Sequence, residues 1–399
     1  MKNYKKPVVL FTTIAALSMS TSAFALNEQD FANKLAISIE YMMAQKIEFN
    51  NVERKGKNII ITGLKSTGAS GKLANALLDT TITFKKVKEN KDGSYTAQSA
   101  SFEDVDFTDE EINVKVNDII ISDILISANP EDNILDMMAL YGAIDIGQIN
   151  ISNKGEEIFK IDNISVTNEA NSDGSEFVST YEVNGIYADL SEIEEEEMRA
   201  DLADFGLTEI NAKMYGQGVW SLNEGRLLAK ENVIDVKNVG KLNINMDIFG
   251  YTLDVVKRMY DDQKSLVGLA IDSPEYDAKT QAMIMTLVSA LSFAEFSIRF
   301  DDYGITSKVL DFVAKEQGTD KEQLVAGFSM MVPAFLSQFN MPELQAQISN
   351  AVSTYLKDPK NIEIKAMPSA PTPIMAFVAL ASNPASLVEA LNVSVSANQ

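Results

Sequence analysis

The sequence predicts an α+β protein in which antiparallel β-sheets, arranged in two linked halves, have apolar helices packed on them. Three observations support this fold class. Long segments alternate apolar and polar residues, which is typical of strands with one wet face. Several helical segments between them lack a polar face. Successive strands also follow one another through short turns, whereas parallel sheets need long crossover connections.

Residues 1–25 have the pattern of a secretory signal peptide. Three lysines precede an apolar run over residues 8–20, and Ala23 and Ala25 form a small-x-small cleavage site. The apolar run is shorter than the ~20 residues of a permanent span, although an uncleaved anchor is the alternative reading. We therefore expect cleavage after Ala25, a periplasmic location and no stable membrane span in the mature chain.

The mature chain is expected to divide into an N-terminal β-rich half, residues 26–190, and a C-terminal α+β half, residues 191–399. Ser191 and Glu194 are spaced as a capping box, which predicts a helix that begins there and ends at Gly206. This acidic helix is the expected boundary. Its run of glutamates is interpreted as a solvated helix face rather than as a metal site.

The N-terminal half is expected to open with a helix and to continue in strands. Apolar residues recur at helical spacing over residues 31–43. Isoleucines and valines then recur at even-numbered positions over residues 112–126, so they would share one face of a strand. This pattern predicts one long strand or a tight strand pair. The parity changes near Gly147, where we expect a β-bulge.

The C-terminal half contains the clearest alternation. Apolar residues occupy every second position over residues 210–220, 242–248, 296–300 and 391–395, with polar residues mostly between them. The only tryptophan, Trp220, falls on the apolar parity of the first of these segments. We therefore expect Trp220 to be a core residue rather than a ligand-stacking one.

Three helical segments of the C-terminal half are apolar almost all round. They cover residues 282–291, 328–339 and 374–380, and the second follows a capping box formed by Thr319 and Glu322. A helix without a polar face is normally buried on several sides. These segments are therefore expected to pack into a closed core or to enclose an apolar cleft.

The composition excludes several classes of function. The chain carries 34 basic and 57 acidic residues, a formal charge of −23, and this field opposes binding to nucleic acid or to anionic membrane surfaces. It has no cysteine and no histidine, so thiol nucleophiles, disulfides, imidazole bases and the usual zinc sites are absent. Only carboxylate, lysine or tyrosine chemistry and oxygen-ligand metal sites are compatible with this composition.

No catalytic residue, metal ligand or cofactor site follows from the remaining motifs. Asp261-Asp262 and Asp301-Asp302 are adjacent pairs, and neighbouring residues of a strand point to opposite faces, so neither pair has the spacing of a glycosidase. Gly216 and Gly218 lack the third glycine and the following helix of a dinucleotide site. Two close glycines in a strand indicate a bulge or tight packing instead.

Part of the C-terminal half resembles known envelope proteins. The residues that carry the likeness are those over 218–227 and 239–244, followed by those over 296–302 and 309–312. In this pattern the chain resembles exported α-proteobacterial envelope proteins of unknown function and, more loosely, the YdgA-type periplasmic family. The resemblance implies a periplasmic location and a β-rich architecture, and it implies no functional residue.

The function we expect is that of a non-enzymatic periplasmic envelope protein that binds an apolar, lipid-like ligand or an envelope partner. Two alternatives remain open, a carboxylate-only enzyme (a glycosidase or a metal-dependent lyase) and the solute-binding protein of an importer. No cofactor is expected. The candidate ligand-binding residues are Met283, Met285, Phe328, Met331, Met375 and Phe377.

Overall fold

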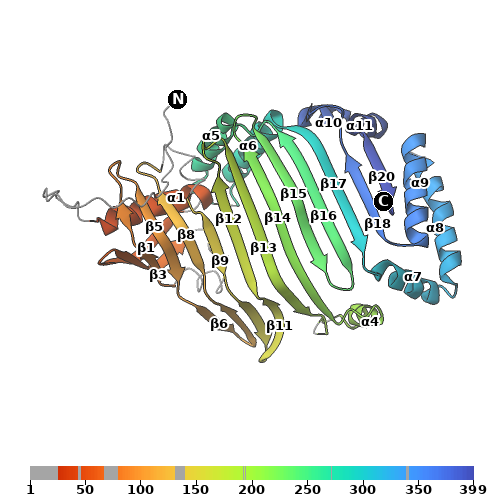
Figure 1. The fold of residues 1–399 in the computed structure, drawn as a ribbon, viewed down its shortest axis with the longest axis horizontal. Helices are drawn as coiled ribbons and strands as arrows, with labels where there is room; N and C mark the ends of the chain where they lie inside the picture. The colour runs from red at the N-terminus through yellow and green to blue at the C-terminus, as the bar shows by residue number, and fades with distance from the viewer. Residues whose placement is uncertain are drawn as a thin grey trace.

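The fold is an extended antiparallel sheet with helices along its borders, so the predicted α+β class is confirmed (Figure 1). The signal peptide expected over residues 1–25 lies outside the described part of the chain. The computed structural model describes residues 26–43, 46–66, 80–130, 140–191, 193, 195–270, 272–337 and 341–399.

The N-terminal end of the sheet has a closed core beneath the predicted first helix, α1 (Glu28–Met43). The Asn27 side chain accepts a hydrogen bond from the Asp30 amide, 3.1 Å away, and so caps this helix. Phe31 and Tyr95 are fully buried between α1 and the strands. These strands are β1 (Ile47–Lys55), β2 (Asn58–Ser66), β3 (Ile82–Lys85), β4 (Lys88–Glu89), β5 (Tyr95–Phe102) and β8 (Ile120–Ile126).

Four strands form a side branch, which pairs with the main sheet through β11 and β13. The strand or tight pair predicted over residues 112–126 is wrong, because β7 and β8 pair with other strands and the backbone turns at Asp118, where φ is +54°. The bulge predicted at Gly147 is instead a connection between two strands with different partners. The branch contains β6 (Val105–Asp109), β7 (Ile112–Val116), β10 (Ile149–Asn153) and β11 (Glu156–Ile161).

The main sheet continues without interruption toward the C-terminus. Its spatial order after β8 is β9, β12, β13, β14, β15, β16, β17, β18 and β20, with every pair antiparallel. The bounds are β9 (Ala143–Ile146), β12 (Asn163–Ala170), β13 (Glu176–Asp189), β14 (Glu209–Ser221), β15 (Arg226–Val236), β16 (Gly240–Phe249), β17 (Ser292–Asp302), β18 (Asn361–Ala366), β19 (Thr372–Pro373) and β20 (Val393–Ala397).

The boundary expected at residues 190 and 191 falls inside this sheet. The two strands on either side of it, β13 and β14, pair from Glu176↔Ser221 to Asp189↔Glu209 with one register shift. β13 is long enough to hold both β12 and β11 on its other edge, which joins the branch to the main sheet. Hydrogen bonding therefore runs across the expected boundary.

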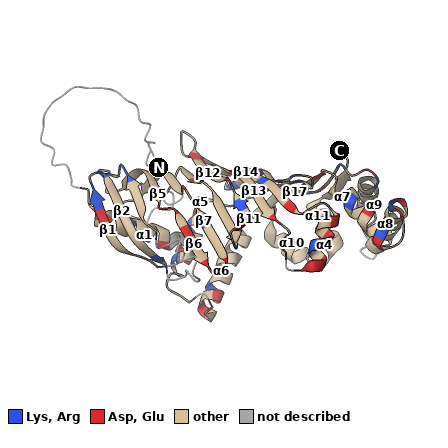
Figure 2. Ribbon diagram, turned by 90° about the horizontal axis from the view of Figure 1, so that it is seen from below, with Lys and Arg blue, Asp and Glu red and all other residues tan. Residues whose placement is uncertain are grey.

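The helices of the C-terminal half border the sheet. In Figure 1, α5, α6, α10 and α11 follow one end of the strands, α4 and α7 the other end, and α8 and α9 the last edge. Figure 2 shows α4, α6, α10 and α11 on one side of the sheet. Their bounds are α4 (Glu196–Asp204), α5 (Leu253–Lys264), α6 (Pro274–Ala290), α7 (Ile305–Glu316), α8 (Lys321–Leu336), α9 (Pro342–Lys357), α10 (Ile374–Leu380) and α11 (Pro384–Leu391).

Both predicted capping boxes are wrong in detail. α4 begins only at Glu196 with Glu195 as its N-cap residue, so Ser191 does not cap it, and Glu194 lies outside the described residues. The helix ends at Asp204, just before Gly206, where φ is +72° and where the end of the helix was predicted. In α8 the cap is Asp320, whose carboxylate accepts from the Gln323 amide at 2.8 Å. Thr319 does not cap α8 because its own amide still donates to Ala314 at the end of α7.

The expectation that the apolar helices are buried on several sides is also wrong. Neither α6 nor α10 has a fully buried residue, and α8 has only Leu324 and Val325. A sheet that is one layer thick offers each border helix a single packing surface. Within the described residues, no helix has both the length and the apolar content needed to cross a membrane.

Candidate functional site

One face of the C-terminal sheet is apolar across several strands. Antiparallel pairing sets residues of neighbouring strands side by side, so the alternation seen in each strand becomes continuous rows. One row runs from Met214 to Ile362 through directly paired residues of β14 to β18. We call the following ten side chains the apolar face: Met214, Ile234, Leu242, Ile244, Met246, Phe296, Ile298, Phe300, Ile362 and Ile364.

None of the ten side chains of the apolar face is fully buried. Met246 is 37 % exposed and Ile364 is 46 % exposed, while the other eight are half-buried. A sheet face of this composition normally lies against a second layer. Figure 1 shows β14 to β17 running between the border helices, with no helix crossing their middle.

Helices cover the apolar face only at its margins. At one end α5 packs against Trp220, which is 5 % exposed and donates from Nε1 to the Tyr251 carbonyl at 2.8 Å. The prediction that Trp220 is a core residue is confirmed. Along the last edge, Ala351 and Tyr355 of α9 pack with residues of β17, β18 and β20.

α6 and α10 contact each other beside the apolar face and present further apolar side chains. Phe377 of α10 meets Phe293 of β17 edge to face, with ring centroids 5.8 Å apart. Five further bulky side chains here are more than one-third exposed, and one of them, Met367, lies just after β18. They are Ile284, Met285, Met367, Met375 and Val378.

The six predicted ligand-binding residues lie in two places rather than one. Met283 and Met285 lie on α6, and Met375 and Phe377 lie on α10, and these two helices contact each other. Phe328 and Met331 lie on α8, which packs with α7 and α9 at the edge of the sheet. Phe328 is half-buried against the cluster formed by α7 and α8, whereas Met331 is 61 % exposed.

The polar groups on the apolar side of the sheet satisfy one another. The Tyr181 hydroxyl donates to Asn232 Oδ1 at 3.2 Å, and Asn232 Nδ2 donates to the Ile244 carbonyl at 3.3 Å. Gly216 lies between these two side chains, where a Cβ atom would come within 2.7 Å of the Tyr181 ring. The tight packing predicted for this glycine is therefore confirmed, and the pair leaves no evident reactive group.

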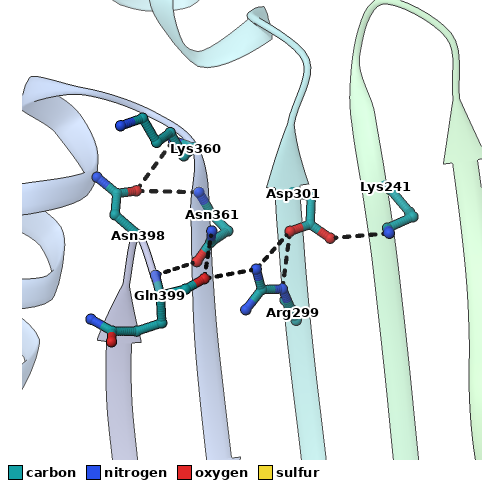
Figure 3. Close-up of polar contacts among 7 residues, drawn as sticks. All are labelled: Lys241, Arg299, Asp301, Lys360, Asn361, Asn398 and Gln399. Carbon is teal, nitrogen blue, oxygen red and sulfur yellow. Dashed lines mark hydrogen bonds and ion pairs between the residues drawn. The ribbon is translucent and has the colours of Figure 1, made fainter.

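The opposite face of the sheet carries charged side chains on β16, β17 and β18. Arg299 donates from Nε to Asp301 Oδ1 at 3.0 Å, and Lys241 lies 3.5 Å from the other oxygen of the same carboxylate (Figure 3). Arg299 also donates to the Gln399 carbonyl at 3.3 Å, and Gln399 exchanges hydrogen bonds with the Asn361 side chain. This polar network makes the part of the opposite face formed by β16, β17 and β18 a poor surface for an apolar ligand.

The structure separates the carboxylates that the sequence sets next to each other. Asp301 joins the ion pairs of the polar face, while Asp302 accepts hydrogen bonds from the amides of Gly304 and Thr306 at the start of α7. Among the described residues, no group of three or more aspartates and glutamates is placed to hold a metal ion. What the site offers is apolar contact area.

Sequence reasoning did not find the apolar face as a site. Alternation over residues 242–248 and 296–300 predicts one apolar and one polar face, and both faces are present. The missing information is the pairing across five strands, which places those residues beside Met214, Ile234 and Ile364. A signal was available in the sequence, because the number of alternating strands exceeds what the nearby helices can cover.

The fold and the site together define a single-layer antiparallel sheet with one partly exposed apolar face. A family model described only as an uncharacterized protein matches residues 233–398, which include most of this face. No curated protein matches the chain.

Proposed function

We propose that the protein is exported to the periplasm and binds an apolar, lipid-like ligand on the apolar face, without catalysing a reaction. The observation that supports this proposal is the partial exposure of bulky side chains both on the apolar face and on α6 and α10 beside it. Exposed apolar patches of this kind mark binding surfaces in soluble proteins. The leader-like residues 1–25 support export.

The dimensions of the apolar face suit one extended hydrocarbon chain. The row from Met214 to Ile362 crosses five neighbouring strands, and strands lie ~4.8 Å apart, so the row extends roughly 20 Å. Each methylene group that leaves water for this surface contributes about 0.8 kcal/mol. An acyl chain laid across the strands would therefore gain most of its binding energy from contact area alone.

Methionines favour a flexible ligand over a rigid one. Met246, Met285, Met367 and Met375 are all exposed by more than one-third. Methionine is unbranched and polarizable, so it adapts to irregular apolar neighbours. The ten side chains of the apolar face include no hydrogen-bonding group, which suits the hydrocarbon part of a ligand and leaves a polar head outside.

Within this proposal the two linked halves have different tasks. The half over residues 26–190 contains closed cores, one under α1 and one in the side branch. The half over residues 191–399 carries the apolar face and the helices beside it. We infer that the first half supports the sheet and that the second half holds the ligand.

The test is native mass spectrometry of protein purified from periplasmic extract and beginning at Leu26, followed by solvent extraction. We expect one lipid per chain. Ile364→Glu places a charge on the apolar face and should abolish co-purification of the lipid. Ser394→Glu is the matched control, since it adds the same charge on a neighbouring strand, at an exposed position that pairs with Lys365 on the polar face.

The proposal fails if wild-type protein carries no extractable lipid and takes up none from mixed vesicles. Retention of the lipid by the Ile364→Glu variant would place the ligand elsewhere. Recovery of the chain only from membranes, or with Met1 at its N-terminus, would contradict the export step.

A further inference from the structure

The outward surface of α8 is apolar from Ala326 to Phe335, after a first turn that exposes Glu322 and Gln323. Residues of this helix that face away from α7 and α9 recur at positions three and four apart, and all are exposed. Met330 is 74 % exposed and Met331 is 61 % exposed, the former being the highest value among the large apolar side chains described. We call the following residues the α8 stripe: Ala326, Gly327, Met330, Met331, Ala334 and Phe335.

The stripe is also free of charge in a strongly acidic protein. No charged residue occurs between Glu322 and Glu343, although the chain as a whole carries −23. An ordinary border helix keeps its polar residues on the solvent side. In α8, Leu324 and Val325 pack inward against α7, and apolar residues face outward as well.

The geometry points to a second copy of this chain as the occupant, with two α8 helices packed antiparallel through their stripes. The order of large and small residues in the stripe is self-complementary about a two-fold axis between Met330 and Met331. Phe335 of one copy then falls opposite Ala326 of the other, and Ala334 falls opposite Gly327. Small residues at these positions allow two helix backbones to approach closely, and a two-fold contact closes on itself.

The position of α8 allows a second copy to approach. Figure 1 places α8 at the extreme end of the long axis, beyond the last strand β20. Two copies joined there meet end to end, so their acidic bodies stay far apart. Charge repulsion between them is then weakest, because interactions beyond the Debye length of about 8 Å are largely screened at physiological salt.

The size of the stripe predicts a weak, reversible dimer. Covering the stripes of both copies removes on the order of 1,000 Å² from water, the low end of specific interfaces. A dissociation constant on the order of micromolar is expected for a small, mostly apolar contact of this kind.

A lipid bilayer fits the stripe less well than a second copy does. Helices that lie in a membrane surface combine an apolar face with lysines and arginines that attract anionic lipids. α8 instead begins with Asp320 and Glu322 beside its single Lys321, and Lys321 pairs with Asp311. The acidic field of the whole chain adds to the repulsion from an anionic surface.

Sedimentation equilibrium tests association directly. Wild-type protein should change from monomer to dimer with rising concentration. Met331→Glu should raise the dissociation constant at least ~10-fold, because two carboxylates would face a desolvated apolar contact. Met198→Glu on α4 is the matched control, a methionine 49 % exposed that lies outside both the stripe and the proposed ligand surface, and should leave the dimer intact.

Cysteine cross-linking tests the antiparallel alignment, and the absence of native cysteines makes it clean. A mixture of Gly327→Cys and Ala334→Cys chains should form a disulfide dimer on mild oxidation. Neither variant alone should do so, since its two cysteines would lie roughly 10 Å apart along the helix axis. A side chain at 327 meets nothing within 4 Å, so this variant should fold.

Three outcomes overturn the inference. One is a monomer at every concentration, and another is cross-linking of Gly327→Cys with itself in place of the mixed pair, which indicates parallel helices. The third is a monomer that floats with neutral or anionic vesicles and is released by Met331→Glu, which identifies a bilayer as the occupant. None of these measurements depends on whether the apolar face holds a lipid.

Discussion

Trp220 lies on the apolar side of β14 and packs against α5, a helix that covers only part of the sheet. Its indole packs between Phe177 and Tyr251, with ring centroids 5.9 Å and 5.5 Å away. Trp220→Ala should lower the free energy of unfolding by about 3–5 kcal/mol, the usual range for emptying a large buried aromatic site. Trp220→Phe should cost less because the phenyl ring keeps part of the apolar packing, although the hydrogen bond to Tyr251 is lost.

Circular dichroism during urea unfolding measures both Trp220 variants, since neither retains the fluorescent side chain. The wild-type protein should show blue-shifted tryptophan emission that resists aqueous quenchers, as its only tryptophan is 5 % exposed. Ready quenching in the folded state would contradict the packing of α5 on the sheet.

Asp30 makes the attachment of α1 to the sheet dependent on pH. Its Oδ2 accepts hydrogen bonds from Tyr95 Oη and Lys34 Nζ, each at 2.7 Å. Burial alone would raise the pKa of Asp30, but these two partners outweigh it and hold the pKa below its ordinary value. A carboxyl with a lowered pKa stabilises the fold above its unfolded pKa of about 3.9, and this contribution is lost as pH falls through the folded pKa.

We therefore expect Asp30→Asn to reduce the stability lost on acidification below about pH 4. Urea midpoints for wild type and variant, measured at several values of pH between roughly 7 and 3, give the difference. The difference in stability between wild type and Asp30→Asn should become smaller toward low pH. A gap that stays constant with pH would show that the carboxylate charge is not what matters at this position.

At the scale of elements, the sequence predicts which segments form helices but not how they are covered. The apolar segment at residues 282–291 belongs to a longer helix, α6, whose N-cap Ser273 and first-turn Pro274 carry ordinary helix-start signals. Its exposure could not be predicted from an apolar composition, because that composition fits a buried helix and a binding surface equally. Only the contact partners distinguish the two, and they lie far away in the chain.

The same limit explains the two wrong capping boxes. Thr319 and Glu322 have the required spacing, yet the end of α7 uses the Thr319 amide and shifts the cap to Asp320. The competing hydrogen bond comes from the preceding helix, so a local pattern cannot reveal it. By contrast, α1 and the alternating strands over residues 210–220, 242–248 and 296–300 were predicted correctly, since their signals depend on periodicity over many residues.

A pair of substitutions separates exposed from buried apolar residues around α6. In ligand-free protein, Met285→Gln should change the free energy of unfolding by less than ~0.5 kcal/mol, because this side chain is 52 % exposed. Leu266→Ala, in the connection between α5 and α6, should cost about 2–5 kcal/mol because Leu266 is 3 % exposed. A comparable loss for Met285→Gln, measured by urea unfolding, would mean that α6 is covered in solution.

At the scale of the whole molecule, the sheet is the one structure that joins all parts of the described chain. Its residues are buried mainly at the N-terminal end, in the side branch and under the border helices, while most residues of the middle strands are half-buried, apart from buried ones such as Val233 and Ser297. Backbone hydrogen bonds between neighbouring strands therefore do much to hold the N-terminal and C-terminal ends of the sheet together. The register between β13 and β14 is the longest of these pairings.

This continuity gives a prediction about the two expected halves. A cut between residues 190 and 191 leaves β14 with an unpaired edge and removes Phe177 from its contact with Trp220. The fragment 191–399, expressed alone, should therefore show red-shifted Trp220 emission and should aggregate through the open edge. Mixing it with fragment 26–190 during refolding should restore the blue-shifted emission of the intact protein. A fragment 191–399 that is monomeric and already blue-shifted would show that the second half folds independently and that β13 merely docks against it.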